Sequence, residues 1–125
     1  MEIIQDDAYE EMAATYQCLE IDRLNTILKQ YGMDDKALRQ KICAEYFSCN
    51  GYFLDAGTFI SQSKQVYPQI AFAERPCDPR RGLGAIETLY VTSASFSFHE
   101  YADGDIYWYF DEHNEDVSEI EHRTI

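Results

Sequence analysis

Residues 94–110 of this chain read ASFSFHEYADGDIYWYF, and bulky apolar side chains alternate at positions 96 and 98 and again at 106, 108 and 110. A period of two is typical of a β-strand with one buried face. Asp103-Gly104 separates the two aromatic runs, and glycine at such a place favours a tight hairpin turn. The stretch therefore predicts a long terminal hairpin in which residues 94–99 pair with residues 106–110.

The length of the turn decides which face of this hairpin is buried. A two-residue turn would place Phe98 opposite Tyr109, whereas a three-residue turn with Gly104 in a left-handed bulge places Phe98 opposite Trp108. We choose the second register because it gathers the bulky apolar side chains on one face. That face consists of Phe96, Phe98, Ile106, Trp108 and Phe110.

The first third of the chain has the spacing of amphipathic helices. Apolar side chains recur three or four residues apart in two sets that lie on rotated faces. The sets are Ala8, Met12, Tyr16 and Leu19, then Leu24, Ile27, Leu28 and Tyr31. The rotation predicts a bend near residues 20–22, and Gly32 predicts the C-terminal end of the second segment.

A further helix is expected after this glycine. Asp34 or Asp35 is a suitable N-cap, and the turn signal Asn50-Gly51 predicts that the helix stops by about Cys49. The predicted buried stripe consists of Leu38, Ile42 and Tyr46.

Short strands are predicted in the middle of the chain. Residues 58–61 and 66–74 flank a polar turn at residues 62–65, and residues 86–91 form or extend a neighbouring strand. Pro68 lies inside the second run, and because proline has no N–H, it favours an edge strand or a bulge there.

These elements predict an α+β fold in a single domain, residues 1–125. Two or three N-terminal helices (about 6–49) would pack on a three- to five-stranded antiparallel sheet (about 58–112). An acidic tail (about 113–125) would follow, either as a short helix or without order. The predicted core consists of Met12, Tyr16, Leu28, Leu38, Ile42, Phe72, Phe96, Phe98, Trp108 and Phe110.

The charge of the chain is strongly negative and unevenly placed. The net charge is −13, and residues 86–125 hold ten acidic residues and one basic residue. Such a field repels nucleic acid and anionic membranes and attracts basic proteins, although solubility alone could also explain it. The candidate partner-binding residues are His99, Tyr101, Asp103, Asp105, Tyr107, Tyr109, Asp111 and Glu112, from the polar face and one end of the hairpin.

No catalytic residue, metal site or cofactor is predicted. His99 and Glu100 are adjacent, so on a strand they would point to opposite faces. The spacing of nine between His113 and His122 suits no metal motif.

The four cysteines lack a Cys-x-x-Cys spacing, and the N-terminus lacks a targeting segment, so we expect free thiols and a cytoplasmic protein.

Residues 75–84 form the one dense basic cluster and give a weaker candidate site. Arg80 and Arg81 could attract an anion, and Gly82 and Gly84 would let backbone amides approach it. The stretch matches neither a P-loop nor a dinucleotide-binding motif. The alternative is a solvated loop whose arginines pair with the acidic ends of the chain.

The leading hypothesis from the sequence is a non-enzymatic, acidic protein-binding domain of a bacterial or phage cell. It would hold a basic partner, as an inhibitor or immunity-type protein holds a nuclease, a toxin or a nucleic-acid-handling complex. One alternative is a small enzyme or an anion- or nucleotide-binding domain that uses residues 75–84 and His99. Another is a structural subunit of a larger assembly. The partner and the oligomeric state do not follow from the sequence.

Overall fold

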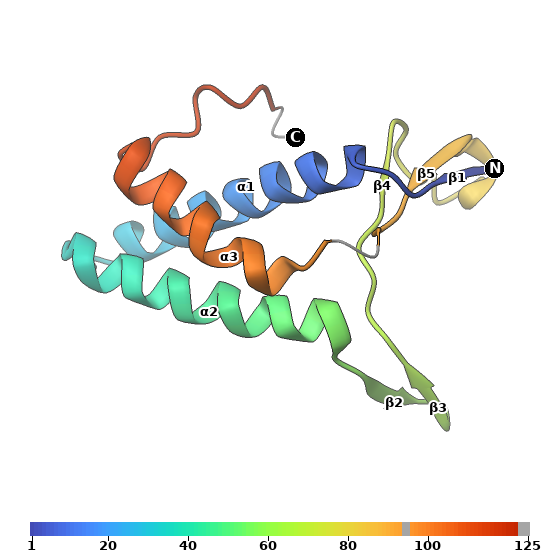
Figure 1. Ribbon diagram of the computed structural model, residues 1–125, viewed down its shortest axis with the longest axis horizontal. Helices are drawn as coiled ribbons and strands as arrows, with labels where there is room; N and C mark the ends of the chain where they lie inside the picture. Colours follow the sequence, from blue (N-terminus) through green and yellow to red (C-terminus); the bar gives the residue numbers. More distant parts are fainter. Residues whose placement is uncertain (94–95, 123–125) are drawn as a thin grey trace.

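Three α-helices and two small β-sheets form the computed structural model, which describes residues 1–93 and 96–122 (Figure 1). Helix α1 spans Ala8–Gln30, α2 spans Lys36–Ala56 and α3 spans Phe98–Tyr107. Helices α1 and α2 run in opposite directions, and α3 packs against both of them. The α+β class is therefore confirmed, but the third helix lies near the C-terminus.

Local sequence explains the connection between α1 and α2. Gly32 has a φ of +87°, and the N–H of Met33 donates to the carbonyl of Leu28 at 3.0 Å, which ends α1 in a glycine-based motif. Asp35 Oδ1 then accepts a hydrogen bond from the N–H of Leu38 at 3.2 Å. The predicted glycine end and aspartate cap are both confirmed.

Two predicted interruptions of the helices are wrong. Helix α1 continues without a break through residues 20–22, and α2 runs through Asn50-Gly51 as far as Ala56. A β-carbon on Gly51 would lie 2.7 Å from the backbone N and Cα of His99. This glycine therefore allows α3 to approach α2 closely, and it does not mark a turn.

The two sheets are small and lie at one end of the helices. The first sheet has the order β1 (Glu2–Ile4), β5 (Thr88–Tyr90), β4 (Phe72–Ala73). Strand β5 pairs in parallel with β1 and antiparallel with β4, so the sheet is mixed, whereas we predicted an antiparallel one. The second sheet is the hairpin β2 (Phe59–Ser61) and β3 (Lys64–Val66), which projects from the end of α2 (Figure 1).

The predicted terminal hairpin is wrong. Residues 98–107 form α3, and the next five residues, Trp108–Glu112, form the π-helical turn η2. Residues 94 and 95 of the predicted first strand lie outside the described residues. Ser97 Oγ caps α3 by accepting from the N–H of Glu100 at 3.3 Å. Both carboxylate oxygens of Asp55 on α2 add to this cap, at 2.8 Å from the N–H of Phe98 and 3.0 Å from that of His99.

The core consists of two groups of buried side chains. The group between the three helices is Ile21, Cys43, Phe47, Ala102, Ile106, Tyr109, Phe110 and Val117. The group near the sheet is Tyr9, Ala13, Phe96 and Phe98. Burial of Phe96, Phe98 and Phe110 is confirmed, whereas Tyr16 and Leu38 are wrong as core residues because both are exposed. The other predicted core residues are partly buried.

The thiols of Cys18 and Cys43 are buried on helices and all four cysteines are free, as predicted. No helix within the described residues is long and apolar enough to cross a membrane.

Candidate functional site

The residues predicted to form one binding face do not share a face. Successive residues on a helix point about 100° apart, so the period-two set is dispersed around α3 and η2. Tyr109 is 0% exposed and Asp105 is 8% exposed, whereas Tyr107 is 56% exposed. The ring of His99 stacks on Tyr52, with ring centroids 3.5 Å apart. The predicted tyrosine surface is therefore absent from the fold.

Tyr109 belongs to a buried polar network that ties α1 to η2. Its hydroxyl donates to Asp22 Oδ1 at 2.6 Å and accepts from Asn25 Nδ2 at 3.1 Å. Burial, followed by the hydrogen bond to Asp22, raises the pKa of Tyr109. The hydroxyl is thus held as a neutral structural group inside the protein.

Arg39 on α2 extends the same network to the segment after η2. Its guanidinium donates to Asn25 Oδ1 at 2.9 Å, to the Met33 carbonyl at 2.8 Å and to Glu115 Oε1 at 2.7 Å. Burial alone would raise the pKa of Glu115, but hydrogen bonds from Arg39, Asn25 and Lys29 lower it to about 2. This part of the predicted tail is therefore fixed to the helices.

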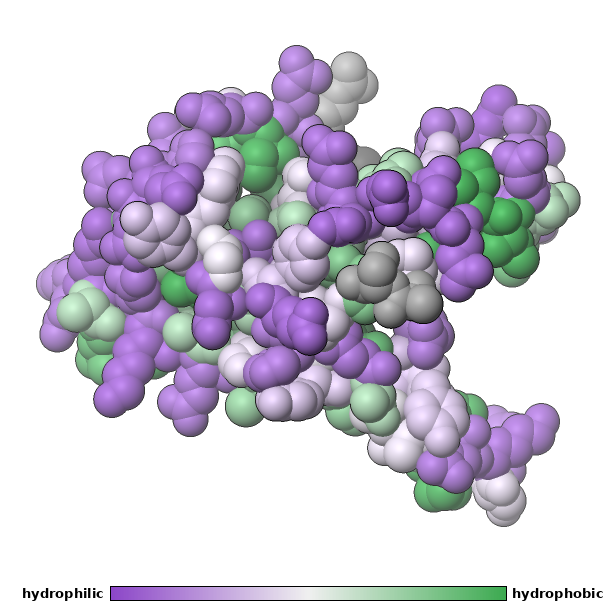
Figure 2. Space-filling view, in the orientation of Figure 1, coloured by the Kyte–Doolittle hydropathy of each residue, from purple (hydrophilic) through white to green (hydrophobic). Residues whose placement is uncertain are grey.

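The remaining carboxylates between α3 and residue 122 form what we call the acidic surface. Residues 98–122 contain nine acidic residues and no lysine or arginine. Two of the nine are the inward-facing Asp105 and Glu115. The other seven are exposed: Glu100, Asp103, Asp111, Glu112, Asp116, Glu119 and Glu121. Hydrophilic side chains dominate this part of the molecule in Figure 2, at the left and along the upper segment.

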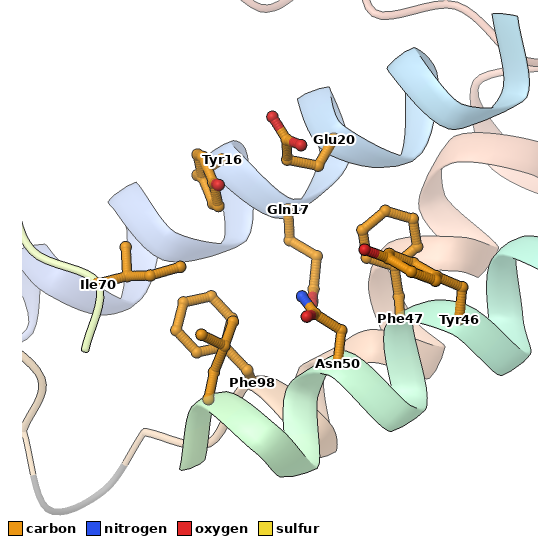
Figure 3. Close-up of a pocket in the computed structure, with 9 residues that line it drawn as sticks. Tyr16, Gln17, Glu20, Tyr46, Phe47, Asn50, Ile70 and Phe98 are labelled. Atoms are coloured by element: carbon orange, nitrogen blue, oxygen red, sulfur yellow. The ribbon is translucent and has the colours of Figure 1, made fainter. Parts of the chain in front are cut away.

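A cleft between α1 and α2 was not predicted. This α1–α2 cleft encloses about 260 Å³ (Figure 3). Its polar lining residues are Tyr16, Gln17, Glu20, Tyr46 and Asn50, and its apolar ones are Phe47, Leu54, Ile70 and Phe98. Figure 3 shows Gln17 reaching from α1 toward Asn50, with Tyr16 and Tyr46 on opposite sides. Burial first, and then the charge of Glu20, raises the pKa of the Tyr16 hydroxyl.

A buried carboxylate lies directly behind this cleft. Gln17 Nε2 donates to Asp105 Oδ2 at 2.7 Å, and both side chains are buried. Burial raises the pKa of Asp105 to about 6, although hydrogen bonds from Gln17 and Cys18 oppose the shift. Within the described residues no lysine, arginine or histidine forms an ion pair with Asp105. The carboxylate is thus held by neutral partners.

A second hollow of about 260 Å³ adjoins the first. Both hollows are lined by Leu54, Ile70 and Phe98. The second also includes Asp55, but that carboxylate already accepts the N-terminal amides of α3. Of the two hollows, the α1–α2 cleft therefore has the polar groups that are less engaged in hydrogen bonds within the fold.

A signal for the buried side of α1 was present in the sequence. The buried positions Tyr9, Ala13, Gln17, Ile21 and Asn25 follow a strict spacing of four. The prediction relied on apolar residues alone, so Gln17 and Asn25 were omitted from the buried face. Asp105 was predicted as a surface residue, and its partner on α1 could not be found from the local pattern.

The loop at residues 75–84 is closed by its own hydrogen bonds. The carbonyl of Asp78 accepts from the N–H groups of Arg81 and Gly82, and Asp78 Oδ1 accepts from the N–H of Arg80 at 2.8 Å. Gly84 lies within the short 3-10 helix η1 (Leu83–Ala85), and its N–H donates to the Arg81 carbonyl at 3.0 Å. An anion would have to compete with these bonds.

The contact between Ser48 and His99 has a structural explanation. His99 Nδ1 lies 3.3 Å from Ser48 Oγ and also 3.3 Å from the Ser48 carbonyl oxygen. In the tautomer that carries its proton on Nδ1, this nitrogen donates to the Ser48 carbonyl, ties α3 to α2 and has no lone pair left to act as a base toward the hydroxyl. Over residues 1–93 and 96–122, no three His, Cys, Asp or Glu side chains form a group that could hold a metal ion.

The fold and the two surfaces describe a small α+β domain with an acidic surface and a polar cleft. Comparisons with protein-family models, with curated proteins and with solved structures gave no match to this chain.

Proposed function

We propose that this chain is a non-enzymatic protein-binding domain that holds a basic partner on its acidic surface. The observation that carries the proposal is the run of seven exposed carboxylates over residues 98–122, a stretch of sequence that contains no lysine or arginine. Carboxylates without nearby cations attract a basic surface at long range and increase the rate of association. Nucleases, toxins and other nucleic-acid-handling proteins present such basic surfaces, so an inhibitor-type role fits this charge.

The position of these carboxylates on an ordered scaffold supports the proposal. Helix α3 is packed on α1 and α2, and the segment that follows is fixed by the bonds from Arg39 to Glu115. A backbone that is already ordered loses little conformational entropy on binding, which favours a specific partner over diffuse attraction.

Binding assays with two matched variants test the proposal. The first variant neutralises Glu100, Asp103, Glu112 and Glu121, and the second neutralises the exposed Glu2, Glu45, Glu74 and Glu87. Both variants remove four negative charges, but only the first alters the acidic surface. A partner is isolated from the host with the wild-type protein at low salt, and its dissociation constant is measured for each variant.

We expect the first variant to lose about tenfold or more in affinity and the second to lose much less. We also expect wild-type affinity to fall as salt rises from about 0.05 to 0.3 M, because salt screens exposed charges. Equal losses in the two variants, or an affinity that stays constant with salt, would show that the acidic surface is not the binding surface.

A second candidate function is a subunit of a larger assembly, and one observation favours it. Phe59, Ile60 and Tyr67 are exposed on or beside the projecting β2–β3 hairpin, and Tyr52 and Phe53 are exposed on the last turns of α2. Side chains of this size tend to be covered at stable interfaces. Light scattering after gel filtration, with Ile60→Ser as the comparison, distinguishes a monomer from an assembly.

A further inference from the structure

We propose that the α1–α2 cleft receives one arginine side chain of the basic partner, which extends the proposed function to a specific subsite. The cleft has two tyrosine rings, two side-chain amides and a carboxylate among its lining residues, and neither a lysine nor an arginine lines it. This composition suits a planar, extended cation.

The size of the cleft favours a single side chain over a larger ligand. Sites for drug-sized molecules usually enclose about 300–1,000 Å³. The α1–α2 cleft has a volume of about 260 Å³, which lies below this range and is suited to one extended side chain. An extended side chain can enter while the rest of the partner stays on the surface.

The geometry of the lining groups matches a guanidinium. Tyr16 and Tyr46 stand on opposite sides of the cleft, and aromatic faces bind guanidinium planes by stacking and by cation–π attraction (Figure 3). Gln17 Nε2 donates to Asp105, and Oε1 is the acceptor atom of the same side-chain amide. Asn50 supplies a second amide from α2, and the amide oxygens can accept the N–H groups of a guanidinium.

The charges around the cleft also favour a cation. Glu20 lines it, and Glu20 Oε1 has only an exposed partner, Arg23, at 3.4 Å. Asp105 lies one hydrogen bond behind Gln17 without a cationic partner among the described residues. A guanidinium in the cleft would be attracted by both carboxylates, whereas an anion would be repelled.

The probes for this subsite are three capped tripeptides that differ in one side chain. They are acetyl-Gly-Arg-Gly-amide, the same peptide with lysine, and the same peptide with citrulline, which has the shape of arginine without its charge. Each peptide is titrated into the isotope-labelled full chain while the side-chain amide signals of Gln17 and Asn50 are followed by NMR. A single side chain is expected to bind in the millimolar range.

Two variants and two controls locate the binding. Glu20→Gln is compared with Glu45→Gln, an equal charge change at an exposed position outside the cleft. Tyr46→Ala is compared with Tyr31→Ala, which alters a tyrosine that is 88% exposed in the connection after α1. Both cleft positions are at the surface or partly exposed, so the variants should fold.

We expect the arginine peptide to shift both amide signals in a saturable manner and the citrulline peptide to leave them unchanged. Lysine should bind more weakly than arginine because an ammonium does not stack as a plane. Each cleft variant should weaken binding roughly two- to fivefold, and each control should leave it unchanged.

Three results would overturn the proposal: no shift up to about 50 mM peptide, equal binding of citrulline, or equal effects of the cleft variants and their controls. The acidic-surface assay is independent of these peptides. If a basic partner binds in a salt-dependent manner but the cleft variants bind it normally, the subsite is wrong and the proposed function stands. If the peptides bind in the cleft but no basic partner depends on the acidic surface, the function is wrong and the cation site remains.

Discussion

Arg39 is a buried side chain that joins three separate segments of the chain. It is 5% exposed, and its three donors reach α1, the α1–α2 connection and the segment after η2. A buried ion pair contributes little compared with apolar packing, but removal of one partner leaves the other charge uncompensated. Arg39 therefore holds the fold together mainly because Glu115 is already buried beside it.

We predict that Arg39→Met lowers the free energy of unfolding by about 3 kcal/mol, because Glu115 and Asn25 lose a buried donor. Urea unfolding followed by circular dichroism measures the change. Lys41→Met, at an exposed position on the same helix, is the control and should change stability by less than about 0.5 kcal/mol. Adding Glu115→Gln should restore part of the loss. If Arg39→Met were as stable as the Lys41→Met control, the structural role of this guanidinium would be wrong.

At the level of single residues, the sequence predicts helix caps but not which polar side chains are buried. The caps at Asp35 and Gly32 could be predicted because each depends on neighbours within a few residues. The burial of Asn25, Gln17 and Arg39 could not be predicted, because each has a partner between 14 and 90 residues away. The candidate cleft was missed for the same reason, since α1 and α2 each supply only part of it.

The contact between α2 and α3 leaves no room for a β-carbon at Gly51. Gly51 lies inside α2, where alanine would normally be more favourable by about 1 kcal/mol. The backbone of His99 lies so near that an added β-carbon would be 2.7 Å away, well inside van der Waals contact. Close packing of the two helices therefore requires glycine here.

Paired glycine-to-alanine substitutions test this contact. Gly51→Ala should destabilise the protein by about 2 kcal/mol or more, since α3 must move away from α2. Gly104→Ala, on the exposed side of α3 with no atom within 4 Å of the added carbon, should stabilise by up to about 1 kcal/mol. Thermal unfolding of both variants measures the difference. A stabilising Gly51→Ala substitution would rule out the close approach.

Residues 98–110 were predicted as a hairpin but form α3 and η2, because their sequence has both a helical spacing and an alternation of two. Phe98, Ala102, Ile106, Tyr109 and Phe110 are spaced as one face of a helix, and these residues are buried. The aromatic residues at 96, 98, 108 and 110 follow a period of two, and aromatic residues favour strands. The sequence Ser97-Phe98-His99-Glu100 carries the Ser-x-x-Glu pattern of a helix start. This local signal favours a helix, and our prediction, which used the alternation alone, did not take it into account.

The distribution of charge over the whole molecule has consequences for stability. Residues 5–57 and 96–122 contain nineteen acidic and five basic residues, whereas the rest of the chain contains four acidic and five basic residues. The excess negative charge thus belongs to the helical part, where like charges repel one another in the folded state at neutral pH. The sequence pI of about 4.4 marks the pH at which this repulsion becomes small.

The buried Asp105 and the partly buried Glu115 have opposite pKa shifts, and both contribute to the pH dependence of folding. The pKa of Asp105 is raised from 3.8 to about 6, so the folded state binds the proton more tightly and its stability falls as pH rises through that range. The pKa of Glu115 is lowered from 4.5 to about 2, so its contribution is complete above about 4.5 and is lost as pH falls toward 2. Both effects, together with the charge repulsion, place maximum stability near pH 4 to 5.

We predict that the free energy of unfolding is greater at pH 4.5 than at pH 7.5, as measured by urea unfolding at constant ionic strength. Asp105→Asn should raise stability at pH 7.5 by up to about 3 kcal/mol, the value that corresponds to a pKa change from 3.8 to about 6. Below pH 4 the advantage should disappear, because wild-type Asp105 is then protonated and neutral. Asp103→Asn, which changes an exposed carboxylate on the same helix, should have little effect at either pH. If Asp105→Asn destabilised the protein at pH 7.5, the raised pKa of Asp105 would be wrong, and the attraction of a cation to the α1–α2 cleft would depend on Glu20 alone.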